Sequence, residues 1–256
     1  MQSPARIAVA GATGRVGRHI AAVLAERGYD VAPISRAQGV DVITGDGLDT
    51  ALQGAAAIID ASTGPSPEQA PATEFFTTAT RNLQAAGQRA GVGRIVAVSI
   101  VGTDRSRGGY ALAKLAHEEA MLAGPVPASI LRATQFHEFV AQLLDWGTNG
   151  DIAYVPQMRT QIVAARAVAE VAADLATAAG LGDGPFTEVA GPQVESMPEL
   201  AALFAARRGY PAKVEGVSDP ANPDRELYEG DGMLPGPGAI VAGPTFEEWL
   251  VADWRP

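Results

Sequence analysis

A glycine-rich turn between a short apolar run and a helical pattern constrains the fold of this chain more than any other feature. The apolar run covers residues 6–10, the turn reads Gly-Ala-Thr-Gly-Arg-Val-Gly over residues 11–17, and residues 19–26 have helical periodicity. A helix that starts directly after such a turn presents unpaired N–H groups at the positive end of its dipole. This order predicts an α/β fold whose first turn binds phosphate groups.

The three glycines of the turn have different expected tasks. Gly11 allows the chain to leave the strand with a positive φ. Gly14 has no Cβ, so a diphosphate can approach the backbone, and Gly17 lets the helix pack closely on the sheet. The residues between them complete the expected dinucleotide contact: Thr13, Arg15 and Val16. The alternative is a glycine-rich turn that merely precedes an ordinary helix.

Composition limits the classes of function. A net charge of −10 argues against nucleic-acid binding, because few cations are available for backbone phosphates. The chain has 0 cysteines, which excludes disulfides and thiolate catalysis and fits a reducing compartment. The Ala-rich, Lys-poor and Arg-preferring composition is typical of a bacterial protein. We expect a cytoplasmic location, since there is neither a signal-peptide pattern nor an apolar run long enough to span a bilayer.

Strand and helix patterns alternate up to about residue 150, which predicts a doubly wound parallel sheet of Rossmann type. The expected strands after the first are residues 30–34, 40–44, 56–61, 94–99 and 129–133, and the expected helices are 48–53, 73–90, 110–123 and 137–146. Only residues 37–39 separate two of these strands, whereas a parallel crossover needs about a dozen residues. Either a crossover helix is missing there, or these segments pair differently.

The pattern changes after residue 149. We expect short extended segments at 152–155 and 161–163, a strand at 186–190, an irregular segment at 216–238, and helices at 164–179, 197–208 and 245–250. Ser196 is the expected N-cap of the helix at 197–208. The expected division is an NAD(P)-binding domain in residues 1–150 and a smaller, partly interleaved substrate-side lobe in residues 151–256.

Residues that follow the second and fourth expected strands are candidate coenzyme contacts. Arg36 stands where an acidic residue would bind the ribose hydroxyls of NAD, and a cation there suits a 2′-phosphate. We therefore expect NADP(H) to be preferred over NAD(H), with Arg15 as a second guanidinium, unless both are surface arginines. Ser62 and Thr63 are expected to bind the coenzyme's ribose or phosphate, or else to cap the strand end.

Tyr110 and Lys114 lie four residues apart at the start of an expected helix, so they share one face of it. Lys114 and Lys213 are the only lysines in the chain, which makes a chance Tyr-x-x-x-Lys match rare. The alternative is an exposed helical pair without a catalytic role. Ser99 ends the preceding strand, and Thr103 is a substitute hydroxyl nearby.

The glycine turn, residues 97–102, Tyr110 to Lys114 and residues 131–136 together resemble NmrA-like atypical short-chain dehydrogenases/reductases. The resemblance implies that Tyr110 is the acid/base and that Lys114 holds the nicotinamide ribose and lowers the tyrosine's pKa. It also implies that Ser99 holds the substrate carbonyl and that Asp46 meets the adenine amino group. For Asp46, a simple turn aspartate between two glycines is the alternative.

The resemblance further implies that a substrate pocket is lined by residues after the sixth expected strand, namely Thr134, Gln135 and His137. For His137 alone, capping or surface exposure is the alternative. Two functions remain open: an NADP(H)-dependent oxidoreductase acting on a small carbonyl, enone or quinone, or a non-catalytic NADP(H)-binding redox sensor. We expect a small-molecule substrate and no nucleic-acid or membrane partner; whether the chain forms a homodimer is open. We also expect no metal site, since His19 and His117 have no partner at ligand spacing.

Overall fold

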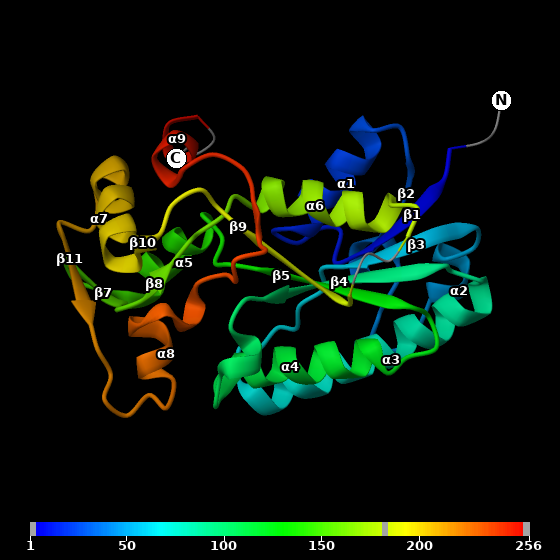
Figure 1. Cartoon of the computed structure of the whole chain (residues 1–256), viewed down its shortest axis with the longest axis horizontal. Helices are drawn as coiled ribbons and strands as arrows, with labels where there is room; N and C mark the ends of the chain where they lie inside the picture. The colour runs from blue at the N-terminus through cyan, green and yellow to red at the C-terminus, as the bar shows by residue number, and fades with distance from the viewer. Residues whose placement is uncertain (1–3, 181–183, 253–256) are drawn as a thin grey trace. The chain divides into compact units, whose positions relative to one another are not determined.

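The computed structural model describes residues 4–180 and 184–252, and its central element is a seven-stranded sheet. From one edge to the other, the strand order is β12-β9-β5-β4-β3-β1-β2 (Figure 1). The strands are β1 (Arg6–Ala10), β2 (Asp30–Ile34), β3 (Ala55–Asp60), β4 (Arg94–Ile100), β5 (Ala128–Ala133), β9 (Phe186–Ala190) and β12 (Ile240–Val241). β1 pairs in parallel with both β2 and β3, and β3 pairs in parallel with β4. The doubly wound parallel fold predicted from the sequence is confirmed.

The chain forms two compact units, and each is made of several segments. The first unit comprises Met1–Ser99, Gly109–Arg132 and Val168–Thr187; the second comprises Ile100–Gly108, Ala133–Ala167 and Glu188–Pro256. All the residues expected to bind the coenzyme, together with Tyr110, Lys114 and Ser99, belong to the first unit. The expected boundary near residue 150 stays a prediction.

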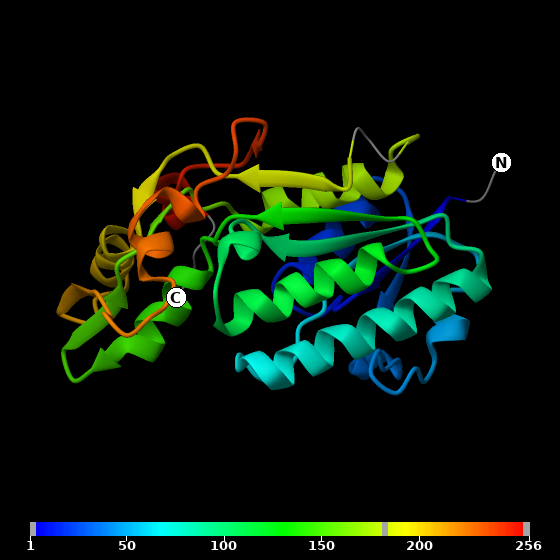
Figure 2. The same cartoon turned by 60° about the horizontal axis from the view of Figure 1, so that its bottom comes forward.

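Helices cover both faces of the strands in the first unit. Its helices are α1 (Gly17–Glu26), α2 (Leu48–Ala51), α3 (Gln69–Ala90), α4 (Gly109–Leu122) and, from Val168 onward, α6 (Ala165–Thr177). Figures 1 and 2 show α3 and α4 side by side on one face, and Figure 1 shows α1 and α6 on the other. An ion pair of 2.7 Å between Arg27 and Asp174 links the end of α1 to α6.

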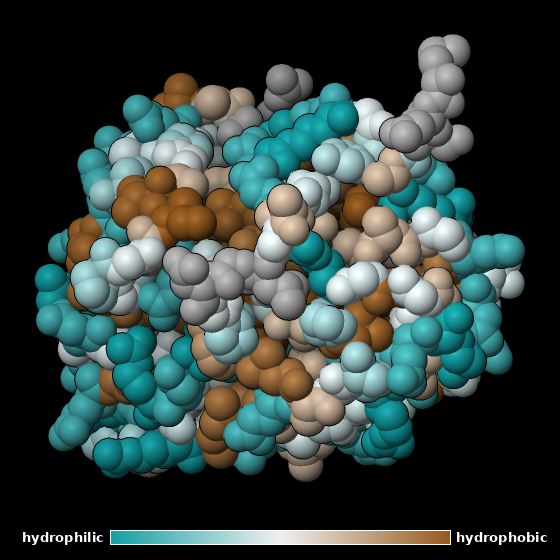
Figure 3. Space-filling view, turned by 45° about the vertical axis from the view of Figure 1, so that its right-hand side comes forward, coloured by the Kyte–Doolittle hydropathy of each residue, from teal (hydrophilic) through white to brown (hydrophobic). Residues whose placement is uncertain are grey.

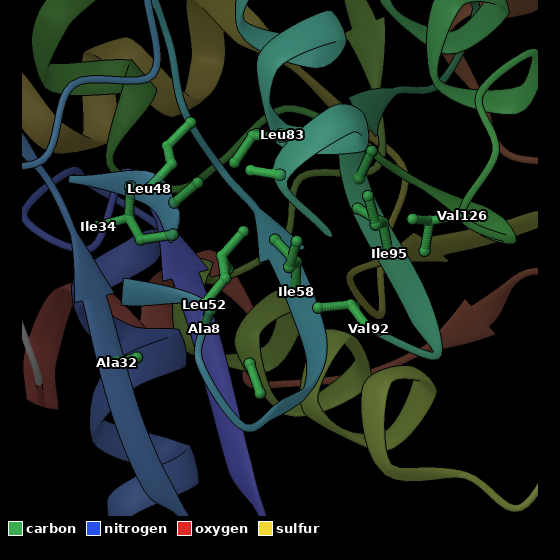
Figure 4. Packing of buried hydrophobic residues seen from close by; sticks show 14 of the residues in the cluster. Ala8, Ala32, Ile34, Leu48, Leu52, Ile58, Leu83, Val92, Ile95 and Val126 are labelled. Atoms are coloured by element: carbon green, nitrogen blue, oxygen red, sulfur yellow. The ribbon is translucent and has the colours of Figure 1, made fainter. Parts of the chain in front are cut away.

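Aliphatic side chains between the sheet and its helices form the core of the first unit. Figure 4 shows Ala8, Ile34 and Ile58 on the strands facing Leu83 of α3 and Leu52 next to α2. Burial of one large aliphatic side chain stabilises a fold by about 1.5–3 kcal/mol. This packing fixes the strands, and with them the turns that follow β1 and β3.

The strand expected at residues 40–44 is not formed. After β2 the chain makes a single 3₁₀ turn, η1 (Arg36–Gln38), and continues as an irregular loop to α2. The loop still buries Val40, and Asn82 donates hydrogen bonds to the carbonyl oxygens of Val42 and Ile43. The apolar residues that resembled a strand therefore anchor a loop, because three residues are too short for a parallel crossover.

The second unit contains two small sheets of its own. Strands β11 (Lys213–Val217), β7 (Ile152–Pro156) and β6 (Thr148–Asn149) form one, and β10 (Glu195–Ser196) and β8 (Arg159–Thr160) form the other. Its helices are α5 (Phe139–Gly147), α7 (Met197–Arg208), α8 (Arg225–Glu229) and α9 (Phe246–Ala252).

Three expectations for the second unit are corrected. The extended segment expected at 161–163 lies two residues earlier, as β8, and Val163 only forms an isolated bridge with Phe136. The segment 216–238 is not wholly irregular, since it contains the end of β11, α8 and the turn η3 (Asp231–Met233). Ser196 does precede α7, but its side chain makes no capping hydrogen bond.

The surface that Figure 3 shows has hydrophobic side chains in groups among hydrophilic ones, as is usual for a folded protein. In the described part of the chain, no helix combines the length and the apolar character that crossing a membrane requires.

Candidate coenzyme and catalytic site

The turn after β1 has no room for side chains at two of its glycines. Gly11 has a φ of +74°, and a Cβ there would lie 2.6 Å from the carbonyl oxygen of Ala61. A Cβ on Gly17 would lie 2.0 Å from the carbonyl oxygen of Gly11. The sequence predicts that Gly17 lets the helix pack on the sheet. In the structure its closest neighbours are instead the backbone atoms of Gly11 and Ala12, in the turn itself. Glycines at these places let the turn fold back on itself and against the residues that follow β3.

The start of α1 carries open backbone donors. Its N-cap, Val16, makes no side-chain capping hydrogen bond. Within the described residues, the N–H groups of Thr13, Val16 and Gly17 donate no hydrogen bond, whereas that of Gly14 donates to Gly11 at 2.8 Å. Unpaired N–H groups at a helix N-terminus favour an anion, so this turn fits the diphosphate of a dinucleotide.

The residues expected near the adenosine end are exposed. Arg36 begins η1, and within the part of the chain that the structure describes its guanidinium makes no hydrogen bond or ion pair. Arg15 and Asp46 are exposed as well. The sequence reasoning missed Ser35, which follows β2 directly and precedes Arg36; its buried hydroxyl has no hydrogen-bond partner among the described residues. The assignments of Arg15, Arg36 and Asp46 stay predictions.

The residues after β3 connect the glycine turn with the expected catalytic helix. Ser62 donates its N–H to Oδ1 of Asp60 at 2.9 Å, and its own buried hydroxyl has no partner within the described part of the chain. The Oγ1 of Thr63 lies 2.9 Å from the hydroxyl of Tyr110. Because the Cα of Ser62 is also the close neighbour of Gly11, the structure brings together residues that are far apart in the sequence.

Tyr110 stands at the start of α4 with its ring against Phe76, at a centroid distance of 5.7 Å. Burial raises the pKa of Tyr110, and the hydrogen bond with Thr63 acts weakly in the opposite direction. The expectation that Lys114 lowers this pKa is therefore wrong for the structure in this state. At neutral pH the Tyr110 phenol is protonated and has a proton to give.

Lys114 is buried, with only 5% of its surface exposed. Its Nζ donates to the carbonyl oxygen of Val98 at 2.8 Å and to Nδ1 of His117 at 2.7 Å. Burial lowers the pKa of Lys114 to about 8, although the charges of Asp60 and Glu118 act in the opposite direction. Lys114 is expected on the same helix face as Tyr110, but its side chain points to the buried polar atoms of Val98 and His117.

This group of residues extends to Asp60, at the end of β3. Nε2 of His117 lies 3.1 Å from Oδ2 of Asp60, and both side chains are buried. Sequence reasoning found no partner for His117, because Asp60 is 57 residues away along the chain. The one available signal was the aspartate inside the apolar run of residues 55–61, where a buried charge needs a partner.

Ser99 lies in a second buried polar group. Its hydroxyl donates to Oε1 of Glu118 at 2.5 Å, and Arg132 donates to both carboxylate oxygens of Glu118 at 3.0 and 2.6 Å. A hydroxyl has a single hydrogen, so a substrate carbonyl would compete with this carboxylate for it. The catalytic assignment of Ser99 stays a prediction. Thr103 belongs to the second unit, and its buried Oγ1 has no partner.

The three expected substrate residues belong to the second unit and are engaged there. Thr134 donates to the carbonyl oxygen of Gln161 at 2.6 Å, and Oε1 of Gln135 accepts from Thr160 at 2.6 Å. His137 is fully buried, with Nε2 3.3 Å from the carbonyl oxygen of Ile162. Their role as substrate contacts stays a prediction.

The second unit also has a cavity of about 490 Å³. It is lined by Gln157, Met158, Arg159, Val194, Glu195, Ser196, Glu199 and Glu229. Burial, together with the nearby charge of Glu247, raises the pKa of Glu195 to about 7. The described residues contain no cluster of three or more histidine and carboxylate side chains with the geometry for a metal ion.

A parallel sheet whose first turn is a glycine cradle with open N–H groups defines the class of dinucleotide-binding Rossmann proteins. Residues 11–178 match the family described as NAD(P)H-binding, and the chain belongs to this family. No curated protein matches the sequence.

Solved structures with the same fold cover nearly the whole chain. MoeE5 in complex with UDP-glucose and NAD has a TM-score of 0.70 at 17% identity, covering 96% of either chain. A dTDP-4-dehydrorhamnose reductase ortholog from Clostridium acetobutylicum has a TM-score of 0.69 at 17% identity, covering 92% of this chain and 89% of that one. WbmH of Bordetella bronchiseptica in complex with NAD+ has a TM-score of 0.67 at 16% identity, covering 97% and 96%. At these identities the similarity shows the fold alone.

Proposed function

We propose that this protein is an NADP(H)-preferring oxidoreductase of the NmrA-like, atypical short-chain dehydrogenase/reductase type. Its proposed substrate is a small carbonyl, enone or quinone compound, and its proposed location is the cytoplasm. The observation that carries the proposal is the 2.9 Å contact between Tyr110 and Thr63. It puts a protonated phenol next to the residues that pack against the glycine turn, which is where a catalytic acid is needed.

Each residue has a proposed task. The open N–H groups of Thr13, Val16 and Gly17 bind the coenzyme's diphosphate, and Arg36 binds the 2′-phosphate. Lys114 contacts the nicotinamide ribose, as the family resemblance implies. When bound, the reduced coenzyme supplies the hydride and is itself oxidised.

Tyr110 provides the proton that completes the reduction. As the carbonyl carbon accepts a hydride, the π-electron pair of the carbonyl moves onto its oxygen, which then takes the phenolic proton of Tyr110. The resulting phenolate is restored by a proton from water. The raised pKa of Tyr110 keeps the phenol protonated before this step.

Substitution of Tyr110 tests the catalytic assignment. We expect wild-type protein to oxidise NADPH with at least one member of a panel of carbonyls, enones and quinones. Tyr110→Phe should lower kcat by about 10²–10⁴-fold, the usual contribution of a general acid. Tyr154→Phe, at an exposed tyrosine of the second unit, is the matched control and should keep full activity. Equal activity of Tyr110→Phe and wild type would remove the acid from the proposal.

The preference for NADP(H) is tested at Arg36. Loss of one guanidinium–phosphate contact should weaken NADPH binding by about tenfold or more, while NADH binding changes less than twofold. Arg89→Ala, which removes an exposed arginine paired with Asp49, should leave both affinities unchanged. Equal losses for NADPH and NADH in Arg36→Ala would refute the assignment.

A second candidate is a non-catalytic NADP(H)-binding redox sensor. It is favoured by the hydrogen bond from Ser99 to Glu118, which occupies the hydrogen that a substrate carbonyl would need. A sensor would bind NADPH and NADP⁺ with different affinities in calorimetry and show no turnover against the same panel. Turnover that depends on Tyr110 would exclude it.

A further inference from the structure

Asp60, at the end of β3, and His117 and Lys114, on α4, form a continuous row of hydrogen bonds. The distances are 2.7 Å from Nζ of Lys114 to Nδ1 of His117 and 3.1 Å from Nε2 of His117 to Oδ2 of Asp60. Phe76 covers the row, since its ring stacks on His117 at 4.8 Å and lies 4.3 Å from Nζ of Lys114. Each of the three side chains is therefore held in place by at least one hydrogen bond, and Phe76 packs against two of them.

The chemistry of the groups sets the direction of these bonds. An ammonium has only hydrogens to donate, so Nδ1 of His117 must be the acceptor and the imidazole hydrogen must be on Nε2. That hydrogen is donated to the carboxylate of Asp60, whose other oxygen accepts the N–H of Ser62 at 2.9 Å. His117 is thus held as the neutral Nε2–H tautomer. Burial and the charge of Lys114 both lower its pKa, which is consistent with this form.

The row does not lead to solvent. Asp60 and His117 are each only 1% exposed, so protons have no outlet at the carboxylate end. Of the three hydrogens of the Lys114 ammonium, two go to Val98 and His117 among the described residues. One hydrogen is left, and its direction is determined by the other two.

We propose that Asp60 and His117 are positioning residues for Lys114, which fix where its remaining ammonium hydrogen points and so make coenzyme binding dependent on the tautomer of His117. The inference deepens the proposed function, because it rests on the contact between Lys114 and the coenzyme. Neither Asp60 nor His117 touches substrate or coenzyme in this scheme.

The charged and titratable groups around Lys114 come from two elements. Asp60 belongs to β3; His117, Glu118 and Tyr110 belong to α4. The negative charges of Asp60 and Glu118 favour the ammonium form of Lys114, while burial disfavours it more strongly. Arg132 already pairs with Glu118, so Asp60 is the carboxylate without a competing cation among the described side chains.

Asp60→Asn tests the row with almost no change of shape. The amide can keep one oxygen for the N–H of Ser62, but its NH₂ group then faces Nε2–H of His117, and two donors meet. If the imidazole changes tautomer to avoid this, its Nδ1–H faces the ammonium of Lys114 instead. In the first case Nδ1 still accepts from Lys114, but His117 loses the carboxylate that holds its ring. In the second case Lys114 loses its acceptor.

The measurement is the dissociation constant of NADPH, by calorimetry, between pH 7 and 10. In wild type we expect affinity to fall about tenfold or more as pH rises through about 8, where Lys114 loses its charge. Lys114→Met should bind weakly at every pH and lack this step. In Asp60→Asn the step should move to lower pH by about one unit or more, because a negative charge near the ammonium is gone. Asp49→Asn, the same change at an exposed carboxylate of the same unit, should leave the step in place.

A second comparison uses His117. Asn at this position carries an acceptor close to the place of Nδ1, whereas Leu carries none, so His117→Asn should keep the wild-type step better than His117→Leu. An unmoved step in Asp60→Asn and in both His117 variants, with the step absent from Lys114→Met, would overturn the proposal.

The tautomer itself is measured on the unaltered protein. Nitrogen-15 NMR at pH 7 should show His117 protonated at Nε2 and unprotonated at Nδ1. A hydrogen on Nδ1 would refute the proposal even if every variant failed to fold. If wild type bound no NADPH while His117 had the expected tautomer, the proposed function would fail and the buried row would stand.

Discussion

Replacement of Gly17 by Ala tests whether the turn after β1 is a cradle built from the main chain. The new Cβ would lie 2.0 Å from the carbonyl oxygen and 2.7 Å from the carbonyl carbon of Gly11. To restore an ordinary contact of 3.4 Å, turn and helix must separate by roughly 1.4 Å, and both neighbours are backbone atoms that no rotamer change can move. We expect a loss of unfolding free energy of about 1–3 kcal/mol, the usual range for overpacking.

The loss of coenzyme affinity should exceed what the loss of stability explains. The N–H groups of Val16 and Gly17 move with the start of α1, so a shift of this size takes them out of hydrogen-bond distance of a diphosphate. We expect NADPH and NADH to bind at least about a hundredfold more weakly, which corresponds to the loss of two charge-assisted contacts. The assays are urea unfolding for stability and calorimetry for both coenzymes.

Two further glycines give a graded series. A Cβ on Gly14 would lie 3.1 Å from the carbonyl oxygen of Gly11, which requires a shift of only a few tenths of an ångström. Among the residues that the structure describes, nothing lies within 4 Å of a Cβ added to Gly180, and its φ is not positive, so Gly180→Ala should be neutral within about 0.5 kcal/mol. The expected order of damage is Gly17, then Gly14, then Gly180. Gly17→Ala protein with wild-type stability and affinity would refute the reasoning.

Two buried groups give predictions on stability alone. Burial lowers the pKa of His137 to about 4, below its ordinary value of 6.5, so the unfolded chain binds more protons between these values and stability falls as pH drops from 6.5 toward 4. His137→Gln cannot titrate, and its difference in unfolding free energy from wild type should change by about 3 kcal/mol over that window; a constant difference would contradict the assignment. In the other group, Glu118→Gln removes the negative charge that lies 2.6 Å from the buried guanidinium of Arg132 and should cost about 3–5 kcal/mol. The double variant Glu118→Leu/Arg132→Met should lose less than that in urea unfolding, and an equal or larger loss would show that the pair itself stabilises the fold.

The parts of the fold that follow from local pattern could be predicted from the sequence. Strands β3, β4 and β5 are continuous apolar runs in an alternating context, and β9 is bounded by glycine and proline, so their positions agree with expectation within one or two residues. Residues 40–44 have the same local pattern and form a loop. The length of the connection explains the difference, because three residues cannot carry the chain back across the sheet to start a further parallel strand.

In the candidate site, too, local contacts could be predicted from the sequence and contacts between distant residues could not. The glycine cradle is local, since Gly11 and Gly17 contact one another's backbone, and a sequence motif is sufficient to find it. The partners of Lys114 are not local. Asp60 reaches the site through the pairing of β3 with its neighbours, and no spacing rule connects it with His117 in the sequence.

Tyr110 and Lys114 show what a sequence motif leaves undetermined about the surroundings of its side chains. Their spacing of four residues does put both on α4, but the side chain of Lys114 points toward β3 and β4 and is buried there. The motif specifies the helix face, whereas the buried acceptors Val98 and His117 specify where the ammonium lies. The pKa of Tyr110 is accordingly governed by burial and by Thr63 rather than by the lysine.

Five ionisable side chains are buried on α4 or in contact with it: Asp60, Lys114, His117, Glu118 and Arg132. Burying two positive and two negative charges costs desolvation free energy, and the attraction between the charges seldom exceeds this cost. Well-packed apolar residues of similar volume would make the fold at least as stable. The aliphatic cluster of the first unit, part of which Figure 4 shows, packs strands and helices of the same unit through apolar side chains. Stability therefore does not account for the polar groups. Three of them share α4 with Tyr110, which favours the interpretation that they serve the protonation and orientation of the side chains at the site.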